Sequence, residues 1–340
     1  MATGTFTAFY PSRPFWAVNG IDFGDPKTMD NFEELMSEEM YTESGETFSL
    51  KICRDGMVMV RIEELEEKDD AAPTATSRIE IIVEKWGEYL DYLNSFYLLL
   101  DSSTLRSMNL AHFNLHEITT RDAFRVGHEN GRIAYYNIAL ESVGSTFQMA
   151  RFRSSYGPTP IAHDPRIATR PTISSEVIWT AAKQFGFVVK NPGLEKVLAS
   201  IAKSISEYKV GNYETSIILA WFTSETVVSK MWKTHISSLN KDVGKGEQRI
   251  NRERRDYLYG RDFTIGLVAN ILELFEVLPF RLFRDIDTVR RLRNKIVHRE
   301  PEYSLTVADA QLAIKTAVEL CRNSCGIDFT PSLSYSVTVL

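Results

Sequence analysis

The first half of the chain combines short alternating stretches with one long helical pattern. FSLKICRDGMVMVRIEEL (48–65) alternates apolar and polar residues around a central Arg-Asp-Gly turn signal, which predicts a β-hairpin. From 79 to 100, large apolar residues recur every three or four positions and predict an amphipathic helix. FRVGHENGRIAYYNIALESV (124–143) predicts a second hairpin around Glu-Asn-Gly. Residues 1–153 are therefore expected to form an α+β domain of short antiparallel strands and one long helix.

The second half shows almost only helical spacing. Residues 154–172 are rich in proline and have no hydrophobic period, so they predict a linker. Helices are expected within 176–189, 193–210, 213–239, 263–277, 286–300 and 307–321. DVGKGEQRINRERRD (242–256) is polar and basic and is expected to be a connecting loop, whereas Thr306 and Asp309 form the spacing of a capping box for the last helix. Residues 173–340 are thus expected to form an all-α bundle.

Length and composition agree with two folded domains. The 340 residues are about twice a typical domain, and 44% of them are hydrophobic. No signal-peptide pattern or long uninterrupted apolar segment is present, so we expect a cytoplasmic protein with no membrane partner. Cys53, Cys321 and Cys325 fit ordinary reduced thiols better than a disulfide framework or a zinc site.

The charge of the chain is unevenly distributed. A net charge of -6 would argue against a nucleic-acid partner. The acidic excess, however, belongs to the first 100 residues, whereas residues 241–300 carry more bases than acids. A nucleic-acid partner is therefore expected at the second half, and the acidic first half is not expected to bind RNA.

The chemistry of interest lies in RRLRNKIVHREP (290–301). On a helical projection Val289, Leu292 and Ile296 share one apolar stripe, and Arg293 falls inside it, about 40° from Val289. A guanidinium cannot be buried without a partner at acceptable cost, so Arg293 must meet an acid or lie at an interface or cleft. Glu225, in the middle of the longest apolar helix, is the candidate acid.

Asn294 and His298 are four residues apart and can face one ligand together. His298 lies in the last turn before Pro301, where the helix dipole favours the protonated imidazole. A titrating histidine beside arginines suits RNA cleavage without a metal. The histidine moves the proton of the 2′-hydroxyl, and the cations stabilise charge on the transition state.

One helix alone makes a poor site from these residues. Arg293 and His298 are about 140° apart around a straight helix and roughly 7.5 Å apart along it. Either the helix distorts before Pro301, or two chains bring two copies together around one phosphate. The second option requires a two-fold homodimer through this helix, and it would also explain an arginine on an apolar stripe.

The spacing Arg293-Asn294-(x3)-His298, in an all-helical unit after a long helix that carries an acid, resembles the R-polar-x3-H motif of the HEPN superfamily (higher eukaryotes and prokaryotes nucleotide-binding). The resemblance covers about residues 190–325. It implies a helical bundle that dimerises through the motif helices and, in active members, cleaves RNA without a metal. It also implies Arg293 and His298 as the catalytic pair, Asn294 as a support, and a role as a toxin or antiviral abortive-infection effector. A neutralising antitoxin is then a possible partner.

Other basic residues are candidates for holding RNA. Glu225 and Arg290 are supporting candidates, and the expected RNA-binding set is Arg249, Arg252, Arg254, Arg255, Lys295 and Arg299. We expect no cofactor, because no Gly-rich phosphate loop, G-x-S-x-G or paired-cysteine motif occurs. We also expect no metal site, because His112 and His116 lie in LAHFNLHEI (110–118), whose alternation is typical of a strand and separates their side chains.

A second hypothesis of a different class remains open. The helical unit can be a non-catalytic interaction module, with ligand or partner binding by the first domain. In that case His298 only complements the helix dipole, and Arg293 forms a structural salt bridge to Glu225. The exposure of His298 distinguishes the two hypotheses, because a nuclease needs this side chain open to solvent.

Overall fold

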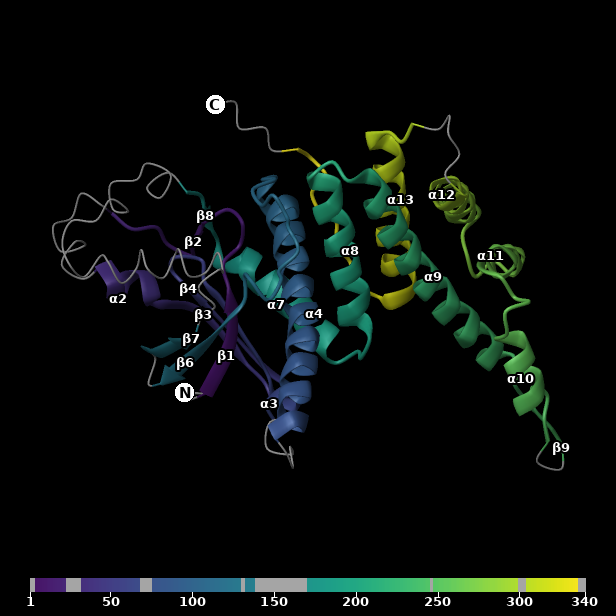
Figure 1. Ribbon diagram of the computed structural model, residues 1–340, viewed down its shortest axis with the longest axis horizontal. Coiled ribbons are helices and arrows are strands. Elements are labelled where there is room, and N and C mark those ends of the chain that lie inside the picture. The colour runs from purple at the N-terminus through teal and green to yellow at the C-terminus, as the bar shows by residue number, and fades with distance from the viewer. Residues whose placement is uncertain are drawn as a thin grey trace. The chain divides into compact units, whose positions relative to one another are not determined.

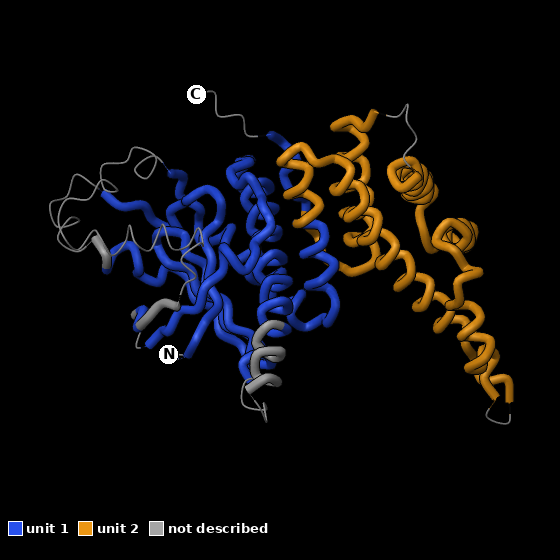
Figure 2. The backbone as a smooth tube through the Cα atoms, in the orientation of Figure 1, with its two compact units in different colours: residues 1–202, 330–340 blue, residues 203–329 orange. Residues whose placement is uncertain are grey.

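The computed structural model describes residues 4–22, 32–67, 75–129, 132–137, 170–244, 247–298 and 304–335. The chain divides into two compact units, residues 1–202 with 330–340 and residues 203–329 (Figure 2). The division falls inside helix α8 (Leu194–Lys209), not at the proline-rich segment 154–172 where the sequence predicts it. Residues 154–169 lie outside the described part of the chain.

The first unit contains a six-stranded antiparallel sheet (Figure 1). Its order is β3-β4-β5-β1-β6-β7. The strands are β1 (Gly4–Phe9), β3 (Glu39–Ser44), β4 (Phe48–Cys53), β5 (Val58–Ile62), β6 (Phe124–Glu129) and β7 (Arg132–Asn137). A short parallel pair, β2 (Trp16–Ala17) with β8 (Thr172–Ile173), lies apart from this sheet. The predicted α+β character of this half is confirmed.

Both predicted hairpins are confirmed. In the β4–β5 hairpin the turn is held by Asp55, whose carboxylate accepts from the Met57 backbone N–H at 3.2 Å and from the Tyr10 hydroxyl at 2.8 Å. Gly56 has a φ of 87°, which a residue with a Cβ rarely adopts. β6 and β7 form the second hairpin, and residues 138–143 of the predicted span lie outside the described part of the chain.

Two helices cover one face of this sheet. The predicted long helix is present as α4 (Ala75–Met108), and α7 (Ser175–Val189) packs beside it. Aromatic rings fill the interface: the Phe9 and Tyr97 centroids are 5.7 Å apart, and Phe185 lies 5.4 Å from Phe48 and 5.5 Å from Phe96. These contacts explain why α7 belongs to the first unit. The shorter helices are α2 (Phe32–Ser37) and α3 (Glu63–Glu67).

The strand-like segment 110–118 has no regular structure, so that prediction was wrong. Its alternation reflects burial alone: Phe113 and Leu115 are buried, and Phe113 packs edge-on against Tyr97 at 5.5 Å. The segment therefore follows the packing of α4 without pairing to a strand. An alternating pattern reports which side chains face a core, and it does not require a sheet partner.

The second unit is helical and is built around α9 (Tyr213–Ser238). Helices α11 (Ile265–Leu274), α12 (Phe280–His298) and α13 (Val307–Cys325) pack against α9 (Figure 1). The predicted connecting loop is more ordered than expected: it contains a small hairpin, β9 (Asp242–Gly244) with β10 (Glu247–Gln248), and helix α10 (Arg252–Leu258). Asn251 caps α10 by accepting from the Arg254 backbone N–H at 2.9 Å.

The ends of the last two helices also bear on the sequence analysis. The capping box is confirmed, because the Thr306 hydroxyl accepts from the Asp309 N–H and the Asp309 carboxylate accepts from the Thr306 N–H. α12 begins at Phe280, earlier than predicted, and Leu282 extends its buried stripe by one turn. Among helices formed by described residues, none has the length and apolar character needed to cross a lipid bilayer.

Candidate functional site

The motif occupies the C-terminal half of α12. The buried stripe of this helix consists of Leu282, Ile286, Val289 and Leu292, so Val289 and Leu292 are buried as predicted, whereas Ile296 is only half-buried. Arg293 continues that stripe and is half-buried. Its Nη1 donates to the Asn294 Oδ1 at 3.2 Å, whereas its Nε is buried without a hydrogen-bond partner. A guanidinium held this way has donor capacity left for a ligand.

Glu225 lies on α9, which packs against α12. Burial raises the pKa of the Glu225 carboxyl, while hydrogen bonding with Trp221 and the positive charge of Arg293 oppose that rise. The two residues are therefore electrostatic neighbours. Within the described part of the chain they are not joined as an ion pair, so the salt bridge proposed for the non-catalytic hypothesis is not formed in this structure. Trp221, which sequence reasoning missed, lies one helical turn before Glu225 and could have been found from that spacing.

The last turn of α12 is open to solvent. His298 is the final residue of the helix and is exposed, as the nuclease hypothesis requires. Val297 is 49% exposed and Ile296 is half-buried, although both continue the apolar side of the helix. The stripe that packs on α9 and α13 at its start is thus incompletely covered at its end. Apolar side chains that continue beyond the part of a helix covered by its own domain are typical of an interface with another chain.

Asp287 controls the first part of the motif. Its carboxylate pairs with Arg290 at 2.7 Å and with Arg291 at 2.6 Å. Hydrogen bonds from Arg290 and then Arg291 lower the pKa of the Asp287 carboxyl. The supporting residue Arg290 is therefore engaged within its own helix. Sequence reasoning overlooked Asp287, although its spacing of three and four residues from the two arginines signals such pairs.

The predicted RNA-binding residues fall into two groups. Lys295 is half-buried on α12, and Arg299 lies outside the described residues. The exposed remainder is Arg249, Arg252, Arg254 and Arg255. These four, on α10 and just before it, are called the basic arm. Trp232 of α9 donates from Nε1 to the Leu258 carbonyl at 2.8 Å and fixes α10 beside the C-terminal end of α9. The motif helix, by contrast, packs on α9 and α13 (Figure 1).

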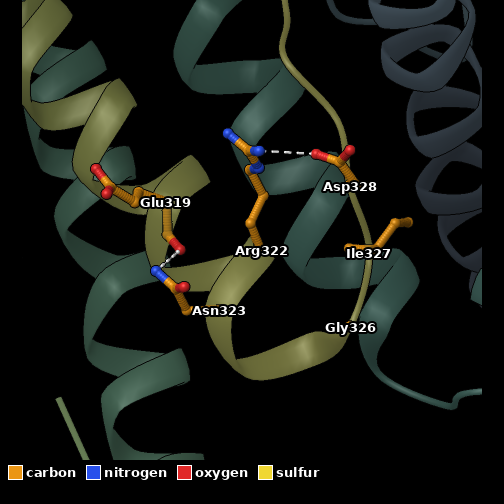
Figure 3. Close-up of a pocket in the computed structure, with 6 residues that line it drawn as sticks. All are labelled: Glu319, Arg322, Asn323, Gly326, Ile327 and Asp328. Atoms are coloured by element: carbon orange, nitrogen blue, oxygen red, sulfur yellow. Dashed lines mark hydrogen bonds and ion pairs between the residues drawn. The ribbon is translucent and has the colours of Figure 1, made fainter. Parts of the chain in front are cut away.

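A cavity of about 420 Å³ opens at the C-terminal end of α13 (Figure 3). Arg322 pairs with Asp328 across it at 2.9 Å, and Asn323 donates to the Glu319 carbonyl at 2.9 Å. Because Arg322 and Asp328 already form an ion pair with each other, the cavity has no strong preference for a charged ligand. None of its lining residues belongs to the predicted site.

His112 and His116 have partners within the first unit. The His112 Nε2 lies 3.1 Å from the Pro14 carbonyl oxygen, and His116 lies 3.9 Å from the Asp122 carboxylate. Burial lowers the pKa of both imidazoles. Within the part of the chain that the structure describes, no group of three or more His, Cys, Asp or Glu side chains is placed to hold a metal ion.

Comparison of the chain with family models, curated proteins and solved structures finds no match. The assignment of a function therefore depends on the geometry of α12 and on the resemblance of its motif.

Proposed function

We propose that the protein is a metal-independent endoribonuclease of the HEPN type, with Arg293 and His298 as its catalytic pair and Asn294 as the residue that orients Arg293. The observation that carries the proposal is the half-buried guanidinium of Arg293, with a buried and unpartnered Nε, on the same incompletely covered helix end as the exposed His298. A buried donor without a partner needs a physical explanation, and a ligand that approaches the guanidinium is one such explanation.

The chemistry follows from these groups. His298 removes the proton of a ribose 2′-hydroxyl, and the oxygen attacks the adjacent phosphorus. The bond from phosphorus to the 5′-oxygen breaks, the 5′-oxygen takes up a proton, and a 2′,3′-cyclic phosphate remains. Arg293 supplies fixed positive charge for the phosphorane-like transition state. Asn294 contributes by holding the guanidinium through its 3.2 Å hydrogen bond.

The site is completed by a second copy of the chain. Arg293 and His298 of one helix project about 140° apart, so neither copy alone surrounds a phosphate. A two-fold contact through the end of α12 places Arg293 of one protomer near His298 of its partner. The same contact covers Val297, which is 49% exposed in the single chain. The half-buried Ile296 extends the apolar area available to such a contact.

The remaining assignments extend the proposal: the RNA contacts rest on the basic residues, and the role in defence rests on the resemblance. The basic arm holds RNA phosphates, Lys295 adds positive charge on the motif helix, Arg290 is a supporting residue paired with Asp287, and Arg299 is a further RNA-binding residue. The first unit senses a trigger or restrains the nuclease. The protein acts in antiviral defence as an abortive-infection effector or toxin, with an antitoxin or regulatory protein as a partner.

Two interactions of Arg293 favour the alternative of a non-catalytic interaction module. Arg293 already donates to Asn294 on its own helix, and the positive charge of Arg293 opposes the pKa rise of Glu225. Both interactions can serve folding alone. In that case the uncovered end of α12 assembles protomers without cutting RNA.

Cleavage of RNA in EDTA separates these two functions. Wild-type protein is expected to cut, and Arg293→Ala and His298→Ala are each expected to lose at least about a hundredfold in rate while remaining folded. Arg291→Ala is the matched control, because Arg291 lies on the same helix with 70% of its side chain exposed, and its ion pair among the described residues is with Asp287. Cutting that survives both site substitutions would refute the assignment, and a wild-type protein that does not cut would favour the interaction module.

A further inference from the structure

The outer face of α7 carries two large aromatic side chains that are exposed to solvent. Trp179 is 52% exposed and Phe187 is 39% exposed. Lys183 and Lys190 are exposed on the same side of the helix, since steps of three and four residues return to one face. The opposite side is core, formed by Val177, Ile178, Ala181, Ala182, Phe185 and Val188. The four exposed residues are called the aromatic–lysine face.

The charges on this face are available for a ligand. The Lys183 Nζ lies 5.0 Å from the centroid of the Trp179 ring, and this exposed cation–π contact is weak enough for a ligand to replace. Among the described residues, no acid forms an ion pair with Lys183 or Lys190. Glu176 is exposed in the first turn of α7, so the positive character belongs to the C-terminal part of the helix. Rings alternating with cations complement a polyanion that presents flat bases.

The spacing of the rings restricts which polyanion fits. Trp179 and Phe187 are eight residues apart, or about 12 Å along the helix. Successive nucleotides of a stacked strand rise only about 3.4 Å, so the two rings cannot each stack on adjoining bases of a duplex. A single strand, in contrast, can splay its bases apart and stack them on separate aromatic rings. Aromatic residues are also common in protein–protein interfaces, but lysine is depleted there, so the two lysines beside the rings favour a polyanion over a protein partner.

We propose that the aromatic–lysine face of α7 binds single-stranded RNA, with bases stacked on Trp179 and Phe187 and phosphates paired with Lys183 and Lys190. The choice of RNA over other single strands rests on the proposed ribonuclease function. The face adds a contact that tolerates any sequence, because every base offers a flat ring. It lies in the first unit, so this unit holds substrate in addition to any regulatory task.

Binding of a fluorescent single-stranded 2′-O-methyl RNA to the full chain tests the proposal, because this RNA cannot be cut. Trp179→Ala and Phe187→Ala are each expected to weaken binding by about tenfold. Binding of an abasic oligonucleotide of equal length is expected to be unchanged in these variants, since it lacks bases to stack. Lys183→Gln is expected to lower the slope of log affinity against log salt by about one. Phe280→Ala, at a 60% exposed phenylalanine on α12, is the matched control.

Equal binding of 2′-O-methyl RNA by wild type, Trp179→Ala and Phe187→Ala would overturn the proposal. So would a change in sedimentation of Trp179→Ala without a change in RNA binding, because that would identify the face as a protein contact. Cleavage is measured separately. If the protein binds RNA through Trp179 but does not cut RNA, the proposed ribonuclease is refuted and the proposed RNA-binding face is retained. If the protein cuts RNA but its RNA binding does not depend on Trp179, the proposed face is refuted and the ribonuclease is retained.

Discussion

At the scale of single residues, the environment of Arg293 links stability to activity. Its side chain is only half-buried, yet its Nε is enclosed without a partner. The nearby carboxyl of Glu225 is itself disfavoured as an anion, since burial raises its pKa more than Trp221 and Arg293 lower it. A charged pair placed close together without a direct ion pair is a poor arrangement for stability alone. This arrangement suits a site in which a bound phosphate accepts hydrogen bonds from the Arg293 guanidinium.

Glu225 yields a pH-dependent prediction. The pKa of the Glu225 carboxyl is higher in the folded protein than its ordinary value of 4.5. Ionisation of Glu225 therefore lowers the free energy of unfolding. This loss of stability develops as the pH rises from 4.5 through the folded pKa and is complete above the folded pKa. Glu225→Gln is therefore expected to raise the melting temperature at pH 7, with a gain that shrinks as the pH approaches 4.5. Glu247→Gln, on the exposed hairpin, is the control. A gain that grows toward acidic pH would contradict this reading of the site.

Sequence reasoning placed these residues only in part. The position of Arg293 on the apolar stripe follows from helix geometry, which is local, and the structure agrees. The contact of Arg293 with Asn294 and the pairing of Arg290 with Asp287 depend on side-chain rotamers that a helical projection does not specify. The distance between Glu225 and Arg293 depends on how α9 and α12 pack, which the sequence alone does not provide.

At the scale of elements, the final helix begins at a strong local signal. Thr306 and Asp309 each satisfy a backbone N–H of the other, and these donors would otherwise lack partners at the start of α13. α13 packs along α9 and against α12, so its first turn supports the helices that carry the motif.

Removing this cap has a defined cost. Thr306→Ala is expected to lower the free energy of unfolding by about 1 kcal/mol, measured by chemical denaturation. Thr226→Ala serves as the control, because Thr226 is an exposed residue inside α9 whose hydroxyl donates to the Phe222 carbonyl. Alanine favours a helix interior, so this variant is expected to lose no stability. An equal loss of unfolding free energy in Thr306→Ala and Thr226→Ala would show that the cap does not stabilise the protein more than an ordinary helix position.

Elements with strong local signals were predictable and others were not. The turn around Asp55 and the helix from 79 to 100 combine periodicity with clear turn or length signals, and both occur. Helix α10 was missed because its charged sequence has no apolar stripe, and it contains no buried residue. Its order comes from the Asn251 cap and from the hydrogen bond between Trp232 and Leu258. These are a short-range and a tertiary contact that hydrophobic spacing does not reveal.

At the scale of the whole molecule, the chain combines an α+β unit with a helical unit whose motif helix is incompletely covered. The division within α8 was not predictable, because a proline-rich segment indicates a break in regular structure but not where packing changes. α7 joins the first unit through Phe185, which packs on Phe48 of the sheet and on Phe96 of α4. Such tertiary contacts set the boundary.

The proposed dimer is tested at Val297. Val297→Glu is expected to turn a dimer into a monomer in sedimentation and to abolish RNA cutting, because it places a charge in an apolar contact. Val210→Glu, at a valine that is 75% exposed at the end of α8, is expected to change neither property. A wild-type monomer that cuts RNA at full rate would contradict the two-chain site.

The most direct test of the proposed ribonuclease is the identity of the RNA ends that wild-type protein produces in EDTA. Attack by the 2′-hydroxyl, with His298 moving the proton and Arg293 stabilising the charge, predicts a 2′,3′-cyclic phosphate on one product and a 5′-hydroxyl on the other, both absent with His298→Ala. Products with a 3′-hydroxyl and a 5′-phosphate would contradict this account, because they arise from attack by water without the 2′-oxygen.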